Sequence, residues 1–234
     1  MTEEEWLACE VPIRMLEFLQ REASDRKFRL LACAIVRSLW QYLDAHTAQP
    51  LVDTFEAYTD GRTLYSEVNE KRGVVSNLAH SLRHDSATRA ALEACLQLTG
   101  MAVNDSTAYW SGRAVVFDAV RVEVLALHAA GGEPDDATDS ASPYQAKVLG
   151  ASLVRDIFGN PFRPVAFDAA WRTSTAVALA AQMYESREFG AMPILADALQ
   201  DAGCDNPDIL NHCRDTAQGH VRGCWVVDLV LGKA

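Results

Sequence analysis

Residues that could bind a metal ion gather near the C-terminus of this chain. They are three cysteines and two histidines: Cys204, His212, Cys213, His220 and Cys224. Zinc prefers thiolate and imidazole ligands, and a structural zinc ion takes four of them in a tetrahedral arrangement. The segment has no C-x-x-C pair, and the adjacent His212 and Cys213 would point in different directions on a helix. Zinc is therefore the one cofactor we consider, while packing between helices is the stronger expectation for these side chains.

The same residues allow a second chemistry, that of a nucleophilic cysteine. Cys213 or Cys224 would have to be a thiolate, stabilised by a neighbouring histidine or arginine. Spacing selects no third residue to orient the histidine. The sequence also lacks the common phosphate-binding, dinucleotide-binding, zinc-protease and serine-hydrolase motifs. A hydrolase or transferase with a C-terminal Cys/His site stays an alternative, and we assign no catalytic residue.

Two further sets of polar residues invite a structural interpretation. Asp228 lies in an apolar run, where an ionised carboxylate needs a partner, and Arg222 is our candidate for a buried ion pair with it. The indole of Trp225 would pack over that pair. Asn160 and Arg163 lie in a turn rich in glycine and proline and could bind a ligand, but fixing the next helix is the expected role of this loop.

The sequence pattern indicates that helices position all these residues. Apolar side chains recur at three- and four-residue steps, and signals for strand hairpins are absent. Capping residues and prolines mark several helix starts, such as Thr173 or Ser174, Pro193, and Pro207 after Asp205 or Asn206. The apolar run 224–231 fits either a helix or a strand. We predict an all-α multi-helix array, with helices over residues 24–44, 49–58, 64–82, 85–99 and 144–158.

A change in composition divides the chain. Residues 131–143 contain four acids and no large apolar side chain, as is typical of a linker or surface loop. They separate an N-terminal helical domain, residues 1–130, from a smaller C-terminal helical subdomain, residues 144–234.

The net charge and the cysteine usage bear on the cellular compartment of the protein and on the classes of partner that it can bind. The formal net charge is −11 over 234 residues, which disfavours nucleic acid and anionic membrane surfaces as partners. The start of the chain lacks the pattern of a signal peptide, and no apolar run approaches the length of a membrane span. We expect a cytoplasmic protein whose six cysteines are reduced.

Several blocks of sequence resemble a paralogous bacterial family, duplicated in planctomycete-type genomes, that carries no assigned activity. The blocks are the EWLAC and ASDRK segments near the N-terminus and the C-terminal FGNPFRP, MPILADAL, AGCD, HCR and HVRGCWVVDLVLGK segments. Members of that family often have more cysteines in the first long helix, where this chain has only Cys33. Any metal site shared between that helix and the C-terminal cluster would therefore be incomplete in this chain. The resemblance implies a family, but no function.

The leading functional hypothesis is a non-catalytic module that binds another protein through a helical face. It depends on the many amphipathic helices and on the lack of a complete catalytic motif. A zinc-binding protein and a Cys/His enzyme are the two alternatives.

Overall fold

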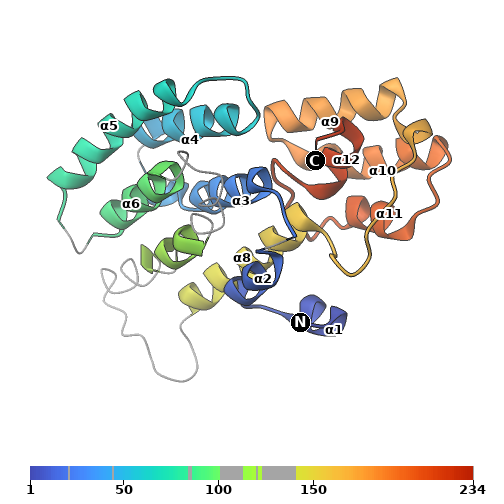
Figure 1. Ribbon diagram of the computed structural model, residues 1–234, viewed down its shortest axis with the longest axis horizontal. Coiled ribbons are helices and arrows are strands. Elements are labelled where there is room, and N and C mark those ends of the chain that lie inside the picture. Colours follow the sequence, from blue (N-terminus) through green and yellow to red (C-terminus); the bar gives the residue numbers. More distant parts are fainter. Residues whose placement is uncertain are drawn as a thin grey trace. The chain divides into compact units, whose positions relative to one another are not determined.

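Figure 1 shows a computed structural model in which every regular element is a helix, as far as the residues it describes. The all-α prediction is confirmed. The structure describes residues 1–20, 22–43, 45–83, 86–100, 113–119, 121–122 and 141–233. Over these residues, no helix combines the length and the apolar character needed to cross a bilayer.

The chain forms two compact units, and the first of them is discontinuous in sequence. We name them the C-terminal unit, Met1–Leu7 with Ser152–Ala234, and the N-terminal unit, Ala8–Ala151. The boundary lies inside helix α8 (Ala141–Phe158). The predicted linker 131–143 lies outside the described residues apart from its last three, which form the start of α8.

The N-terminal unit is arranged around one buried helix. Helix α3 (Asp25–Ser38) carries the predicted stripe of Phe28, Leu31, Ala32 and Ile35, all of them buried. It ends six residues earlier than predicted and is followed by the 3₁₀ turn η1 (Trp40–Tyr42). The other helices of this unit are α2 (Pro12–Leu19), α4 (Ala45–Thr59), α5 (Tyr65–Ser81), α6 (Ala87–Gly100) and a helical segment at 113–119.

Helix α4 departs from its predicted start. The sequence pattern placed the first turn at Pro50, but the helix begins at Ala45 and contains that proline. On α4, Glu56 is 1% exposed and accepts a hydrogen bond of 2.7 Å from Nε of Arg37 on α3. A buried carboxylate needs such a partner, so this pair links the two helices.

Asp118 gives the N-terminal unit a predicted pH dependence. Burial raises its carboxyl pKa, Arg121 lowers it and Glu93 raises it, to about 6 overall. The unfolded chain has the ordinary value of 3.8, so ionised Asp118 destabilises the fold as the pH rises from about 4 to about 6. Urea midpoints of Asp118→Asn and the parent should agree near pH 3.5, and the variant should be more stable above about pH 6.5. A difference that does not change with pH would contradict this assignment.

The C-terminal unit is built from short helices with clear capping signals. Thr173 Oγ1 accepts from the Ala176 N–H at the start of α9 (Ser174–Ser186), and Asn206 Oδ1 accepts from the Asp208 N–H at the start of α11 (Pro207–Arg214). Gly203, with φ of +89°, follows the end of the preceding helix, α10 (Met192–Asp201). The helices are α1 (Glu3–Ala8), the end of α8, η3 (Ala169–Trp171), α9 (Ser174–Ser186), η4 (Phe189–Ala191), α10 (Met192–Asp201), α11 (Pro207–Arg214) and α12 (Trp225–Leu231).

The N-terminal residues are tied into this unit by hydrogen bonds. Nη2 of Arg155 on α8 donates to the carbonyl oxygens of Trp6 and Leu7, each at 3.0 Å, and Trp6 is fully buried. Nδ2 of Asn160 donates to the Glu3 carboxylate at 2.8 Å. Both ends of the chain therefore contribute to the fold of this unit.

Candidate metal centre

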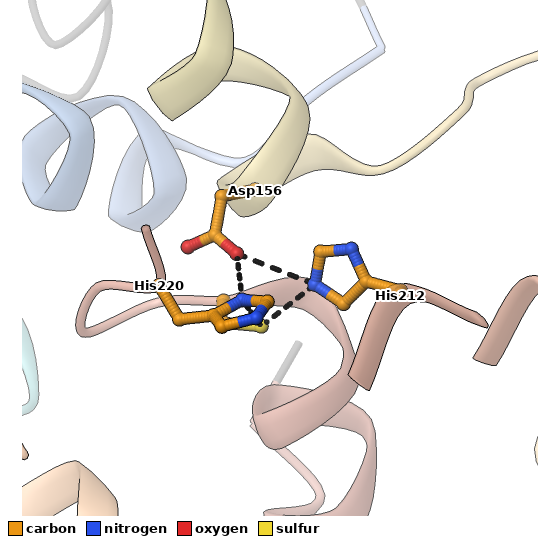
Figure 2. Close-up of side chains that lie close together, drawn as sticks. Asp156, His212 and His220 are labelled. Atoms are coloured by element: carbon orange, nitrogen blue, oxygen red, sulfur yellow. Dashed lines mark hydrogen bonds and ion pairs between the residues drawn. The ribbon is translucent and has the colours of Figure 1, made fainter. Parts of the chain in front are cut away.

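Four side chains of the C-terminal unit converge on one point. They are Asp156, His212, His220 and Cys224, and one ligand atom from each lies within 4.8 Å of all the others. Figure 2 shows ring nitrogens of both histidines directed at one oxygen of the Asp156 carboxylate. We call these four residues the convergent cluster. It is the only such group of His, Cys, Asp and Glu side chains among the described residues.

Three separate segments supply the convergent cluster. Asp156 lies in the last turn of α8, and His212 lies on α11. His220 lies in the connection that follows, and Cys224 immediately precedes α12. The chain between His220 and Cys224 forms a turn, and the helix begins only at Trp225.

A tight turn brings His220 and Cys224 together. The Cys224 N–H donates to the Val221 carbonyl at 2.9 Å, and Gly223 has a φ of +97°. A positive φ at the third position is the mark of a type II turn and favours glycine there. Gly223 is therefore a positioning residue for the cluster.

Four of the six separations between ligand atoms lie near those of a tetrahedral zinc site. His220 Nδ1 lies 2.7 Å and His212 Nε2 lies 3.3 Å from Asp156 Oδ1. Cys224 Sγ lies 3.2 Å from the same His212 nitrogen and 3.9 Å from the same His220 nitrogen. Zinc bonds of about 2.0–2.3 Å at tetrahedral angles place ligand atoms roughly 3.3–3.6 Å apart. Ion binding would require the His220 and Asp156 ligand atoms, now 2.7 Å apart, to separate, and the most distant ligand atoms, up to 4.8 Å apart, to approach each other.

The side chains of the convergent cluster have little exposure to solvent. The side chain of Asp156 is 0% exposed, that of His220 is 6% exposed and that of His212 is 9% exposed, while Cys224 is fully buried. The second carboxylate oxygen of Asp156 accepts from the Val221 N–H at 2.9 Å, which fixes the carboxylate and directs Oδ1 at the histidines. Such a bond behind a ligand is a regular feature of metal sites.

The pKa values of the two acidic groups in the convergent cluster, Asp156 and Cys224, shift in opposite directions. Burial raises the pKa of Asp156, but hydrogen bonds and charge from His212 and His220 lower it more, so the net pKa falls below its ordinary value. Burial and the Asp156 charge raise the pKa of the Cys224 thiol well above its usual range, against hydrogen bonds from the backbone N–H groups of Val227 and Val226. Without an ion, Cys224 is therefore a neutral thiol at neutral pH.

The geometry gives little support to a nucleophilic cysteine. A Cys–His–Asp relay uses the two ring nitrogens of one histidine on different partners. Here Nε2 of His212 faces both Asp156 and Cys224, and Nδ1 of His220 does the same. A raised thiol pKa also opposes nucleophilic attack. Nitrogens that each face both acidic groups are arranged for a common central ion.

Two of the five sequence candidates lie outside the convergent cluster. Cys204 and Cys213 are buried in the apolar core of the unit with Leu195, Leu199 and Ile209. Burial raises the pKa of Cys213 to about 12. Adjacent His212 and Cys213 do point to different surroundings, as their neighbouring positions on a helix predicted.

The predicted ion pair of Arg222 with Asp228 stays a prediction, although both residues are buried. The Arg222 guanidinium lies 4.3 Å from the ring centre of Tyr184, and its Nη2 lies 3.6 Å from the Glu185 carboxylate. The ring of Trp225 lies 5.1 Å from that of His212. The guanidinium thus contacts the Tyr184 ring, and the indole packs against a cluster histidine.

The candidate loop residues contact the first helix of the chain. Besides its bond to Glu3, Asn160 accepts a hydrogen bond from the Phe162 N–H at 3.0 Å. Arg163 forms ion pairs with Glu3 and Asp208. These contacts agree with the structural role expected for this loop.

Asp156 is the member of the cluster that was not predicted from the sequence. It is fully buried on α8 next to Ile157, which is also fully buried. The family resemblance of the sequence likewise stays a prediction. No protein family model, curated protein or solved structure matches this chain.

Proposed function

We propose that the C-terminal unit is a zinc-binding domain in which Asp156, His212, His220 and Cys224 hold one Zn²⁺ ion. The observation that carries the proposal is the convergence of four different ligand atoms in a buried site. A buried carboxylate, two imidazoles and a thiol are costly to hold together unless they have a common partner.

The donor set favours zinc over other common ions. Mg²⁺ and Ca²⁺ prefer shells made entirely of oxygen, whereas two imidazole nitrogens, one thiolate and one carboxylate suit Zn²⁺. Zinc binding would remove the Cys224 proton, because a coordinating thiol is deprotonated. The negative charges of thiolate and carboxylate would then balance the 2+ charge of the ion.

The low side-chain exposure of the four ligands favours a structural role for the ion. Catalytic zinc keeps one position open for water or substrate, whereas structural zinc is closed by four protein ligands. The ion would cross-link α8 to α11 and to the turn before α12, two segments that lie more than fifty residues further along the chain. The protein-interaction hypothesis stays a prediction, and a cross-linked unit of this kind would provide a rigid surface for it.

Metal analysis of the purified full chain tests the proposal. After reconstitution with zinc and gel filtration, we expect about one equivalent of zinc per chain. Cys224→Ala should lose most of the bound zinc, and Cys213→Ala is the matched control because it removes another buried thiol from the same unit. Retention of less than about a tenth of an equivalent by the folded parent would refute the proposal.

A further inference from the structure

A pocket of about 270 Å³ adjoins the convergent cluster in the C-terminal unit. Its apolar lining comes from Phe189 of η4, from Met192 and Pro193 at the start of α10, and from Cys213 of α11. Gln218 and His220, from the connection after α11, line the pocket as well. The volume lies near the lower end of the range for small-molecule sites, which is about 300–1,000 Å³.

Two residues of the pocket lining carry buried side-chain nitrogens that lack hydrogen-bond partners. Nε2 of His220 and Nε2 of Gln218 have none within the described part of the chain. Buried polar atoms are nearly always satisfied by protein, water or ligand. Because both residues line one pocket, a single acceptor group bound there could satisfy both of them.

A metal ion on the cluster determines whether Nε2 of His220 is a hydrogen-bond donor, so the inference rests on the proposed function. An ion on Nδ1 leaves the proton of the neutral imidazole on Nε2, which is then a hydrogen-bond donor. The side-chain amide nitrogen of Gln218 is a donor as well. A zinc-loaded protein therefore presents two donors beside an apolar wall.

Charge selects among acceptor groups. Asp215 also lines the pocket, and its carboxylate is held by a 3.0 Å hydrogen bond from the Ala217 N–H. The chain carries a net charge of −11. Both features oppose a carboxylate or phosphate ligand and leave a neutral carbonyl as the favoured acceptor.

We propose that this pocket binds a small neutral molecule in which an amide carbonyl adjoins an aromatic or branched apolar group. The carbonyl accepts from His220 Nε2–H and from the Gln218 amide. The apolar group packs on Phe189, Met192 and Pro193.

A titration with benzamide tests the proposal on the zinc-loaded full chain. The imidazole N–H of His220 is followed by ¹H–¹⁵N NMR, and zinc content is measured separately on the same sample. We expect a saturable shift with a dissociation constant of about 1–10 mM, a range that suits a ligand of this size. Benzoate tests the charge and toluene tests the carbonyl, and each should bind about tenfold more weakly.

A pair of glutamine variants provides the matched control. Gln218→Leu should weaken benzamide binding about tenfold. Gln200→Leu removes a glutamine of α10 that contacts Arg214 and does not line the pocket, so it should leave binding unchanged. Absence of a saturable shift at about 20 mM benzamide with zinc bound would overturn this inference alone. Equal binding of the three probes would also overturn it, and failure to bind zinc would overturn both proposals.

Discussion

Withdrawal of zinc by a chelator is expected to lower the melting temperature of the C-terminal unit by about 15 °C or more. An ion that binds only the folded state, at a concentration about a thousandfold above its dissociation constant, adds about 4 kcal/mol of stability. For a unit of this size, each kcal/mol corresponds to about 4–8 °C. Calorimetry of the full chain before and after chelation measures the effect.

Hydrogen exchange locates the loss of stability. Amides of α11 and α12 should lose protection on chelation, whereas those of α5 in the N-terminal unit provide an internal control. Added zinc should restore the protection and added magnesium should not, because the donor set suits zinc. Unchanged protection in a sample shown to be free of zinc would count against a structural ion.

The second large effect is expected from Asp156→Asn. The amide keeps the shape of the side chain and can still accept from the Val221 N–H, but it removes the anionic ligand. Zinc affinity should fall about 100-fold or more, which corresponds to about 2.7 kcal/mol. Asp228→Asn, which alters another buried aspartate of the same unit, should leave the affinity near that of the parent. Competition with a chromophoric chelator measures the zinc affinity of the parent and of both variants.

Comparison of stabilities with and without zinc separates a ligand from a purely structural carboxylate. If Asp156 only accepts hydrogen bonds from His212 and His220, Asp156→Asn destabilises the zinc-free and zinc-loaded proteins equally. If Asp156 binds the ion, most of the loss is confined to the zinc-loaded protein. Equal urea midpoint shifts in the two forms would therefore contradict its assignment as a ligand.

Local signals in the sequence accounted for much of the fold. Side-chain caps at Thr173 and Asn206 were predictable because they involve residues two or three positions apart. The run 224–231 was ambiguous because a short apolar stretch suits both helix and strand. Pro50 was misleading as a helix start, because the sequence pattern does not show that the helix already begins at Ala45, before the proline.

The candidate site was predictable only in part. His212, His220 and Cys224 stood out because reactive side chains are dense in the tail. Asp156 lies more than fifty residues before these three residues in the sequence, and no short-range pattern predicts such a contact. Its one sequence signal was a carboxylate next to apolar residues of a helix, the reasoning that had been applied to Asp228. Composition does not separate the core residues Cys204 and Cys213 from the cluster, because it does not reveal which way a side chain points.

The bonds from Arg155 to the carbonyls of Trp6 and Leu7 bear on how the C-terminal unit can be isolated. A fragment cut at residue 144 or 152 would leave out the buried indole of Trp6 and the Glu3 side chain that holds Asn160. Because Leu7 lies against Arg155, a short flexible connector from residue 7 to residue 152 could replace the intervening polypeptide. Such a shortened chain, rather than a simple truncation, is the natural minimal fragment for metal titrations.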